Sequence, residues 1–273
     1  MPSPCTQNSY FDAPEHDMAD IESDDRHLRA IAKRIEELRA EATEQLRRRG
    51  RDAAGVLQQS VQREVELHQA ARRLRQLDRM GAHACLGFMV DAATGERTYI
   101  GRLGLCDAQG EQLLVDWRAA AAEPFFAATH AEHRGLSMRR RYRWRRQRVA
   151  GYFDEVFELE PGQHAGQLDD YSAFLASLGE RRTGRMNDVL STLQADQDAL
   201  IRSSSRGALV IEGGPGTGKT VVALHRAAYL LHADAQLRSR GGRILVVSPH
   251  DAYTEYVADI LPNLGEDEVL VST

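Results

Sequence analysis

Long hydrophobic runs are missing from this chain of 273 residues. No apolar stretch approaches the roughly 18 residues that a membrane-spanning helix needs. The first 25 residues are polar and acidic and lack the apolar core of a secretory signal. These absences predict a cytoplasmic protein with no membrane partner. Cysteine is scarce as well, because Cys5, Cys85 and Cys106 are too few and too widely spaced for a disulfide framework or a zinc site, and we expect reduced thiols.

Aromatic residues make up only 6% of the chain, whereas 42% of its residues are hydrophobic. This balance is typical of a helix-rich α/β protein, and the length suffices for a sizeable core divided over two or three units. The net charge of −5 conceals a local asymmetry, because residues 1–24 are acidic while arginines gather further along the chain. We expect residues 1–24 to be disordered.

Residues 25–80 carry hydrophobic side chains at the three-four spacing of amphipathic helices. The two series are Leu28, Ile31, Ile35, Leu38, Ala42 and Leu46, and then Leu57, Val61, Val65, Leu67, Leu74 and Leu77. Segment 48–55, which holds three arginines and two glycines, separates them. The pattern predicts an antiparallel coiled-coil hairpin that projects from a globular body and has a tip containing Arg48, Arg49 and Arg51. A helical pair packed on the main domain, or a dimeric coiled coil, fits equally well.

Residues 81–160 are rich in β-forming residues. Strands are expected at 86–90, 97–105 and 112–117, joined by turns, and together they predict a small antiparallel meander. Asp116-Trp117-Arg118 follows, just before the aromatic pair Phe125-Phe126. We interpret this charged pair beside large aromatics as a packed corner, with contact to a ligand as the less favoured alternative.

Seven arginines alternate with aromatic residues near the end of this block. They are Arg139, Arg140, Arg141, Arg143, Arg145, Arg146 and Arg148. Arginines bind phosphates and aromatic rings stack on bases, so the segment could contact DNA. An acidic protein partner would satisfy it too, as would a structural strand with Tyr142 and Trp144 on one face and the acidic stretch from Asp154 as its neighbour. Residues 161–184 are then expected to form a linker and a helix.

The run Gly213-Gly214-Pro215-Gly216-Thr217-Gly218-Lys219-Thr220 matches the phosphate-binding pattern GxxxxGK[ST]. An apolar stretch at 208–211 precedes it and an unbroken run to about Leu231 follows, so we expect a strand, a loop and a helix. The glycines let backbone N–H groups turn inward on phosphate oxygens at the N-terminus of the helix. Lys219 is expected to reach the β- and γ-phosphates, and the Thr220 hydroxyl to ligate Mg²⁺.

After this helix the chain offers a strand at 243–248, a helix at about 251–264 and the start of a strand at 269. An acidic Mg²⁺ motif (Walker B) and an arginine finger, which ATP turnover requires, are not identifiable, so no catalytic residue is assigned. We interpret the sequence as the N-terminal part of a longer motor, which leaves ATP turnover by this chain alone uncertain.

Residues 193–201, the stretch 206–211 and the phosphate loop together resemble the start of a superfamily 1 helicase motor of the UvrD/Rep type. The resemblance implies an incomplete RecA-like ATP-binding domain over residues 185–273. It also assigns Gln197 to the adenine edge, a task that suits an amide because it can donate and accept at once. Ser248-Pro249-His250-Asp251 stands where such motors carry a motif that contacts single-stranded DNA.

Further features are similar to one branch of these motors, the helicase IV-like, HelD-type ATPases. These features are the helical hairpin, the strand at 99–105, the turn Asp116–Ala119 and the loop continued through Arg226, while Ala120 departs from an expected proline. The resemblance implies an ATP- and Mg²⁺-dependent protein whose hairpin binds bacterial RNA polymerase and which recycles the polymerase from stalled complexes. The alternative is a DNA helicase that translocates on single strands. A third hypothesis is a coiled-coil adaptor in which bound nucleotide serves only to stabilise one conformation.

Overall fold

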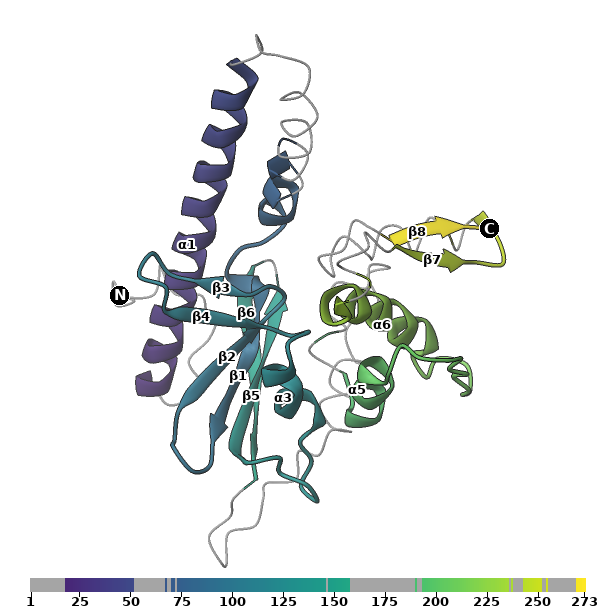
Figure 1. The fold of residues 1–273 in the computed structure, drawn as a ribbon. Coiled ribbons are helices and arrows are strands. Elements are labelled where there is room, and N and C mark those ends of the chain that lie inside the picture. Colours follow the sequence, from purple (N-terminus) through teal and green to yellow (C-terminus); the bar gives the residue numbers. More distant parts are fainter. Residues whose placement is uncertain are drawn as a thin grey trace, which may run out of the picture.

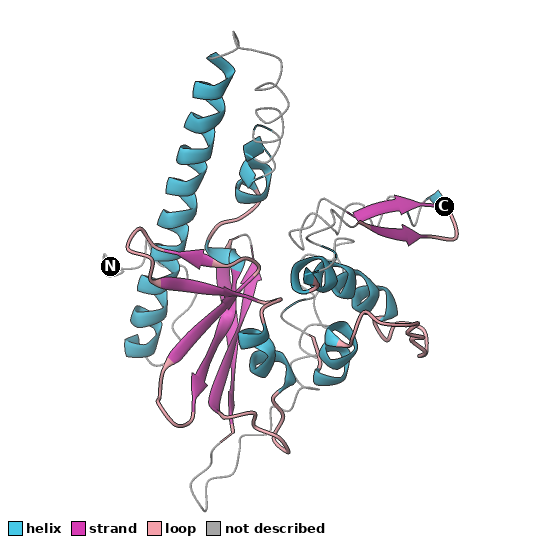
Figure 2. Cartoon of the chain, viewed as in Figure 1, coloured by secondary structure: helices cyan, strands magenta, loops and turns pink. Residues whose placement is uncertain are grey.

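The structure is a computed structural model that describes residues 18–51, 67, 70–71, 73–145, 147–157, 190, 193–235, 237, 243–251, 254 and 269–273. Over these residues the protein mixes helix and sheet: a long N-terminal helix, a six-stranded mixed sheet, a group of short helices and a two-stranded parallel sheet (Figure 1 and Figure 2). In the described part of the chain, no helix combines the length and the apolar character that crossing a membrane would require.

The long helix α1 extends over Met18–Arg51. Its 34 residues correspond to about 51 Å at 1.5 Å per residue. Leu28 and Ile31 on its inner face are completely buried, which confirms the three-four pattern. The helix begins before the expected start near Asp25, and it continues through Arg51, where the sequence had suggested an earlier break. An ion pair of 2.8 Å between Arg48 Nε and Glu44 Oε1, one turn apart, favours this continuation.

A second helical segment, residues 73–78, lies beside α1 (Figure 1). Arg39 of α1 joins the two, because its guanidinium donates to the carbonyls of Leu77 (2.8 Å) and Met80 (3.1 Å) and lies 3.0 Å from the Asp78 carboxylate. The base of the predicted helical pair is therefore present. Residues 52–66, which include the rest of the predicted tip, lie outside the described part of the chain.

The larger sheet has the strand order β3-β4-β2-β1-β5-β6. Its strands are β1 (Cys85–Asp91), β2 (Arg97–Gly101), β3 (Leu105–Cys106), β4 (Gln112–Asp116), β5 (Leu136–Arg145) and β6 (Arg148–Val156). A short 3-10 helix, η1 (Ala82–Ala84), precedes β1. Cys85 and Cys106 both lie in strands and both are free thiols, as expected.

The prediction of a purely antiparallel meander was wrong, because β2 and β4 pair in parallel. The expected strand at 97–105 is divided into β2 and β3 by an irregular segment, residues 102–104, directly after Gly101. A Cβ atom at Gly101 would lie 2.8 Å from the Leu114 side chain and 3.1 Å from the Ala84 carbonyl oxygen, so a larger residue would be crowded where β2 ends. The chain then returns as the β3–β4 hairpin, and this crossing makes β4 run in the same direction as β2.

Alternate side chains of the sheet enter two hydrophobic cores. Phe88 and Leu114 point into the core shared with α1, whereas Leu86 and Val115 point into the core on the opposite face. The second core also includes side chains of α3 (Glu123–Ala127), α5 (Ala195–Arg202) and α6 (Lys219–Ala233). A 3-10 turn, η2 (Ala120–Ala122), leads into α3. The sheet thus lies between α1 and the short helices (Figure 1).

The strands β7 (Ile244–Val247) and β8 (Val269–Ser272) lie where the sequence predicted strands, and they pair with each other in parallel. The strand expected at 208–211 is absent. Residues 207–214 have no regular secondary structure, no strand of the described part of the chain pairs with them, and Val210 is 76% exposed. The predicted segment at 161–184 and most of the predicted helix at 251–264 lie outside the described residues.

Candidate nucleotide-binding site

The phosphate loop lies directly before α6, in the predicted order of loop and helix. Gly216 (φ 79°) and Gly218 (φ 84°) both adopt the left-handed conformation, and Gly218 is the N-cap of α6. A side chain at either position would be strained. At Gly213 a Cβ atom would lie 2.7 Å from the Thr217 hydroxyl, so glycine also keeps the inside of the loop open. Backbone conformation and close packing thus explain why glycine occupies these positions of the motif.

Lys219, the first residue of α6, folds its side chain back into the loop. Its ammonium group donates to the carbonyls of Gly213 and Gly214, at 2.6 Å each. The Thr217 hydroxyl also donates to the Gly214 carbonyl, at 2.9 Å. Thr220 follows as the second residue of α6. The loop therefore gathers a positive charge, a hydroxyl-bearing residue and the N-terminus of a 15-residue helix, a combination suited to anionic oxygens.

Gln197 lies against the same loop, although twenty positions separate it from Thr217. It occupies the third position of α5, where its Oε1 accepts from the Gln194 N–H (3.2 Å) as part of a capping box. Its Nε2 donates to the Thr217 carbonyl at 3.2 Å. The structure thus brings together Gln197 and the phosphate loop.

Two arginines that the sequence analysis did not single out hold α5 and α6 in place. Arg226 of α6 donates to the carbonyls of Leu200 (3.0 Å), Ser203 (2.7 Å) and Ser204 (2.7 Å), at the C-terminal end of α5. A cation at this end of a helix is favourable. The other, Arg202, pairs with Asp198 one turn earlier, at 2.9 Å. Burial raises the pKa of Asp198, and the neighbouring Arg202 opposes this rise.

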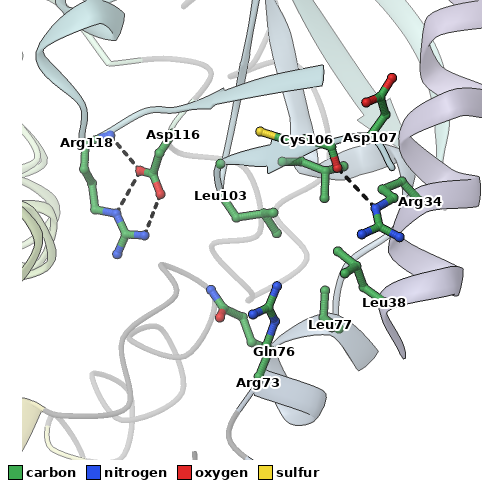
Figure 3. A pocket seen from close by; sticks show the side chains of 12 residues that line it. Arg34, Leu38, Arg73, Gln76, Leu77, Leu103, Cys106, Asp107, Asp116 and Arg118 are labelled. Carbon is green, nitrogen blue, oxygen red and sulfur yellow. Dashed lines mark hydrogen bonds and ion pairs between the residues drawn. The ribbon is translucent and has the colours of Figure 1, made fainter. Parts of the chain in front are cut away.

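The turn Asp116–Ala119 connects the larger sheet to both helices. Arg118 and Asp116 form a buried ion pair of 2.7 and 2.9 Å (Figure 3), which agrees with the packed-corner interpretation. Arg202 donates to the carbonyls of Trp117 (2.7 Å) and Ala119 (3.2 Å). The Trp117 ring also contacts the ring of His225 on α6, with the centroids 5.5 Å apart. The turn therefore contacts the helix of Gln197 and the helix of Lys219.

At its first three positions the arginine-rich segment has a structural role, which supports the structural-strand alternative and argues against contact of these three residues with DNA. Arg139, Arg140 and Arg141 are buried in β5. Arg139 pairs with Glu155 at 2.6 and 2.7 Å, and Arg140 with Asp154 at 2.6 and 2.7 Å, so the acidic strand β6 neutralises them. Arginines buried in ion pairs cannot reach phosphates. Arg145 is exposed, Arg143 and Arg148 are half-buried, and Arg146 lies outside the described residues.

Arg140 also reaches α1. Its Nη1 donates to Asp24 at 2.8 Å, and the Tyr142 hydroxyl donates to the same carboxylate at 2.7 Å. Asp24 is completely buried. Residues 18–24 of the acidic segment belong to α1, residues 1–17 lie outside the described part of the chain, and Asp24 anchors this end of α1 to the sheet.

Two family models match the chain. Residues 21–170 match the N-terminal domain of DNA helicase IV HelD, and residues 193–255 match the UvrD/REP helicase N-terminal domain. The first match alone covers more than half of the sequence. The chain belongs to the HelD family of UvrD-like helicases. A search of curated proteins finds no match.

The two matches divide this HelD-family chain along its fold. The HelD match includes α1 and the six-stranded sheet, whereas the UvrD/REP match contains α5, the phosphate loop, α6 and β7. Every residue predicted to bind nucleotide lies in the second match. UvrD-like helicases generally use nucleotide and Mg²⁺, and the residues of this loop fit such a group.

A cleft of about 670 Å³ lies where the helical pair meets the sheet (Figure 3). It is lined by Arg34, Leu38, Arg73, Gln76, Leu77, Leu103, Gly104, Leu105, Cys106, Asp107, Asp116 and Arg118. Arg34 donates to the Cys106 carbonyl at 3.2 Å across this space. The cleft thus borders α1, the second arm of the pair and the Asp116–Arg118 turn at once. In the described part of the chain, no cluster of three or more His, Cys, Asp or Glu residues could hold a metal ion.

Proposed function

We propose that this chain is the ATP-binding N-terminal part of a helicase-family motor that binds bacterial RNA polymerase and recycles it from stalled complexes by ATP hydrolysis. The observation that carries the nucleotide half of this proposal is the Lys219 ammonium held inside a glycine loop at the N-terminus of α6. Among side chains, an ammonium is a strong binder of phosphate.

The proposed roles follow from the positions of the residues. The backbone of Gly213, Gly214, Pro215, Gly216, Thr217 and Gly218 would surround the phosphates, Lys219 would bind the β- and γ-phosphates and Thr220 would ligate Mg²⁺. Gln197, beside the loop, would contact the adenine edge. The parallel pair β7–β8 and helix α6 would belong to a RecA-like domain. Bound Mg²⁺ would neutralise phosphate charge.

The polymerase half of the proposal rests on the helical pair. α1 is anchored to the sheet at one end and extends past the sheet at the other (Figure 1), and the second arm lies beside it. A projecting helical pair on a HelD-type N-terminal domain is suited to insertion into a partner protein such as RNA polymerase. The chain would use segment 48–55 as the contacting tip, which would make a coiled-coil hairpin the polymerase-binding element.

A DNA helicase is the second candidate, and the UvrD/REP match supports it. Ser248 follows β7, and its hydroxyl bonds to the Thr254 hydroxyl at 2.6 Å, which orders the segment that the resemblance assigns to single-stranded DNA. The burial of Arg139, Arg140 and Arg141 weakens the other argument for DNA, because only Arg143, Arg145 and Arg148 among the described arginines of that segment reach the surface. We therefore favour RNA polymerase as the partner.

A pull-down of core RNA polymerase distinguishes the two candidates. The chain with Arg48, Arg49 and Arg51 changed to glutamate is expected to lose most of its capture, because the tip would no longer complement an acidic surface. Changing the exposed Arg26, Lys33 and Arg79 to glutamate is the matched control, since it alters the charge equally at the base of the helical pair.

Single-stranded DNA serves as competitor in the same experiment. Capture that only the tip variant loses, and that DNA does not displace, supports the polymerase proposal. Equal capture of polymerase by both variants argues against the tip as the polymerase contact. Salt-sensitive binding to DNA without any capture of polymerase favours the helicase.

A further inference from the structure

Two aromatic rings in contact, Trp117 and His225, each carry a buried nitrogen without a hydrogen-bond partner among the described residues. Trp117 is 0% exposed and His225 is 2% exposed. Neither Nε1 of Trp117 nor Nε2 of His225 has a partner among the described residues. Buried polar groups are nearly always satisfied, so two unsatisfied ones in a single ring contact require an explanation.

The two nitrogens are complementary. His225 Nδ1 lies 2.7 Å from the Val221 carbonyl, which can only accept, so Nδ1 carries the proton and Nε2 is left as an acceptor. Burial lowers the pKa of His225 to about 4, so the ring is neutral near pH 7. The Trp117 indole is a donor only. An unused donor and an unused acceptor therefore lie in rings whose centroids are 5.5 Å apart, with an interplanar angle of 67°.

The position of His225 connects this contact to the phosphate loop. Lys219 and His225 belong to the same helix, six residues or about 9 Å apart along its axis. The Lys219 ammonium now bonds to the Gly213 and Gly214 carbonyls. Phosphate oxygens compete for that ammonium, because hydrogen bonds between two charged groups are stronger than those to a neutral carbonyl. Occupation of the loop therefore changes the forces on the first turn of α6.

We propose that Trp117 and His225 form a nucleotide-sensing pair, in which the indole N–H donates to Nε2 of His225 when the phosphate loop is occupied. This inference rests on the proposed function, because it requires nucleotide in the loop. The shift of α6 that closes the hydrogen bond would be transmitted to the Asp116–Ala119 turn. Asp116 and Arg118 line the cleft at the base of the helical pair. The Trp117–His225 hydrogen bond would therefore couple the nucleotide site to the polymerase-binding arm.

The two tryptophans of the chain allow a direct test by ¹H–¹⁵N NMR of the indole groups. Trp144 is an internal control, because its Nε1 already donates to the Cys85 carbonyl at 2.7 Å. A Trp144→Phe variant assigns the two signals. On addition of Mg-ATP, the Trp117 indole proton is expected to move downfield with the midpoint that calorimetry gives for binding, while the Trp144 signal stays in place.

Variants at position 225 test the acceptor. His225→Phe keeps an aromatic ring but has no acceptor, so the Trp117 shift should disappear while calorimetric binding persists. His225→Gln keeps an amide oxygen and should retain part of the shift. In the unsubstituted protein, the Nε2 resonance of His225 should move together with the Trp117 proton, which tests the acceptor without any substitution.

The outcomes separate this inference from the proposed function. Calorimetric binding with an unmoved Trp117 signal, or with the same shift in His225→Phe, overturns the sensing pair and leaves nucleotide binding intact. Absence of calorimetric binding to the unsubstituted chain overturns the proposed function, and the sensing pair with it.

Discussion

At the phosphate loop, individual residues show how local sequence determines the conformation of a loop. Gly216 and Gly218 adopt left-handed conformations that few other residues tolerate, and Lys219 occupies the interior that these turns create. All of these residues are contiguous, so the motif could be identified from the sequence alone. The sequence associates Gln197 with the loop only through the resemblance to superfamily 1 motors, and the role of Gln197 at the adenine edge stays a prediction.

Replacing Lys219 by alanine tests the loop at this scale. A hydrogen bond to a charged group contributes about 1.5–3 kcal/mol, so Lys219→Ala is expected to weaken Mg-ATP binding by at least about 10-fold. Calorimetry measures the affinity, and circular dichroism should show an unchanged fold. Lys33→Ala, at a side chain that is 80% exposed, is the control and should bind normally. Unaltered ATP binding by Lys219→Ala would contradict the assignment of the loop.

At the scale of elements, the structure depends on contacts between parts of the chain that are distant in sequence. Arg140 and Asp24 are 116 positions apart, and Tyr142 is 118 positions from the same carboxylate. The helical periodicity of α1 and the strand content of residues 81–160 were predictable because both depend on local patterns. The parallel pairing of β2 with β4 and the burial of Arg139–Arg141 were not, because both depend on the path of the chain in three dimensions.

The anchoring of α1 can be tested at Asp24. Asp24→Ala leaves Arg140 and Tyr142 buried without one of their partners, so we expect a loss of about 3–5 kcal/mol in the free energy of unfolding. Urea unfolding measures this loss. Glu22→Ala, an exposed acidic residue on the same helix, should change the free energy by less than about 0.5 kcal/mol. Similar values for the two variants would show that the Asp24 network does not hold α1.

At the scale of the whole molecule, a half-buried histidine, His27, and a buried one, His225, lie where the layers meet. His27 stacks on Tyr99 between α1 and the sheet, with ring centroids 3.6 Å apart, and His225 contacts Trp117 between the sheet and α6. Burial lowers the pKa of both. A histidine with a lower pKa in the folded protein than in the unfolded chain resists protonation in the fold, so its contribution to stability is present above pH 6.5 and is lost as the pH falls towards the folded pKa.

The direction of this pKa shift predicts that lowering the pH reduces the free energy of unfolding. With a pKa of about 4 for His225 in the fold and 6.5 in the unfolded chain, lowering the pH from 7 to 5 should cost on the order of 2 kcal/mol through this residue alone. Urea unfolding at both pH values measures the loss, and His225→Gln should reduce it. His250→Gln, at a histidine exposed to solvent, is the matched control variant. Identical pH dependence in His225→Gln and the parent would refute the prediction.

The anchoring of α1 by Asp24 also has a mechanical consequence. Leu28, Ile31 and Ile35 fix the first half of the helix to the sheet, while its second half extends past the sheet's edge (Figure 1). Because α1 is a rigid helix held at one end, a small rotation at the anchored end displaces the other end, near Arg51, by a larger distance. Displacements too small to rearrange the core could therefore produce a much larger movement at the far end of α1.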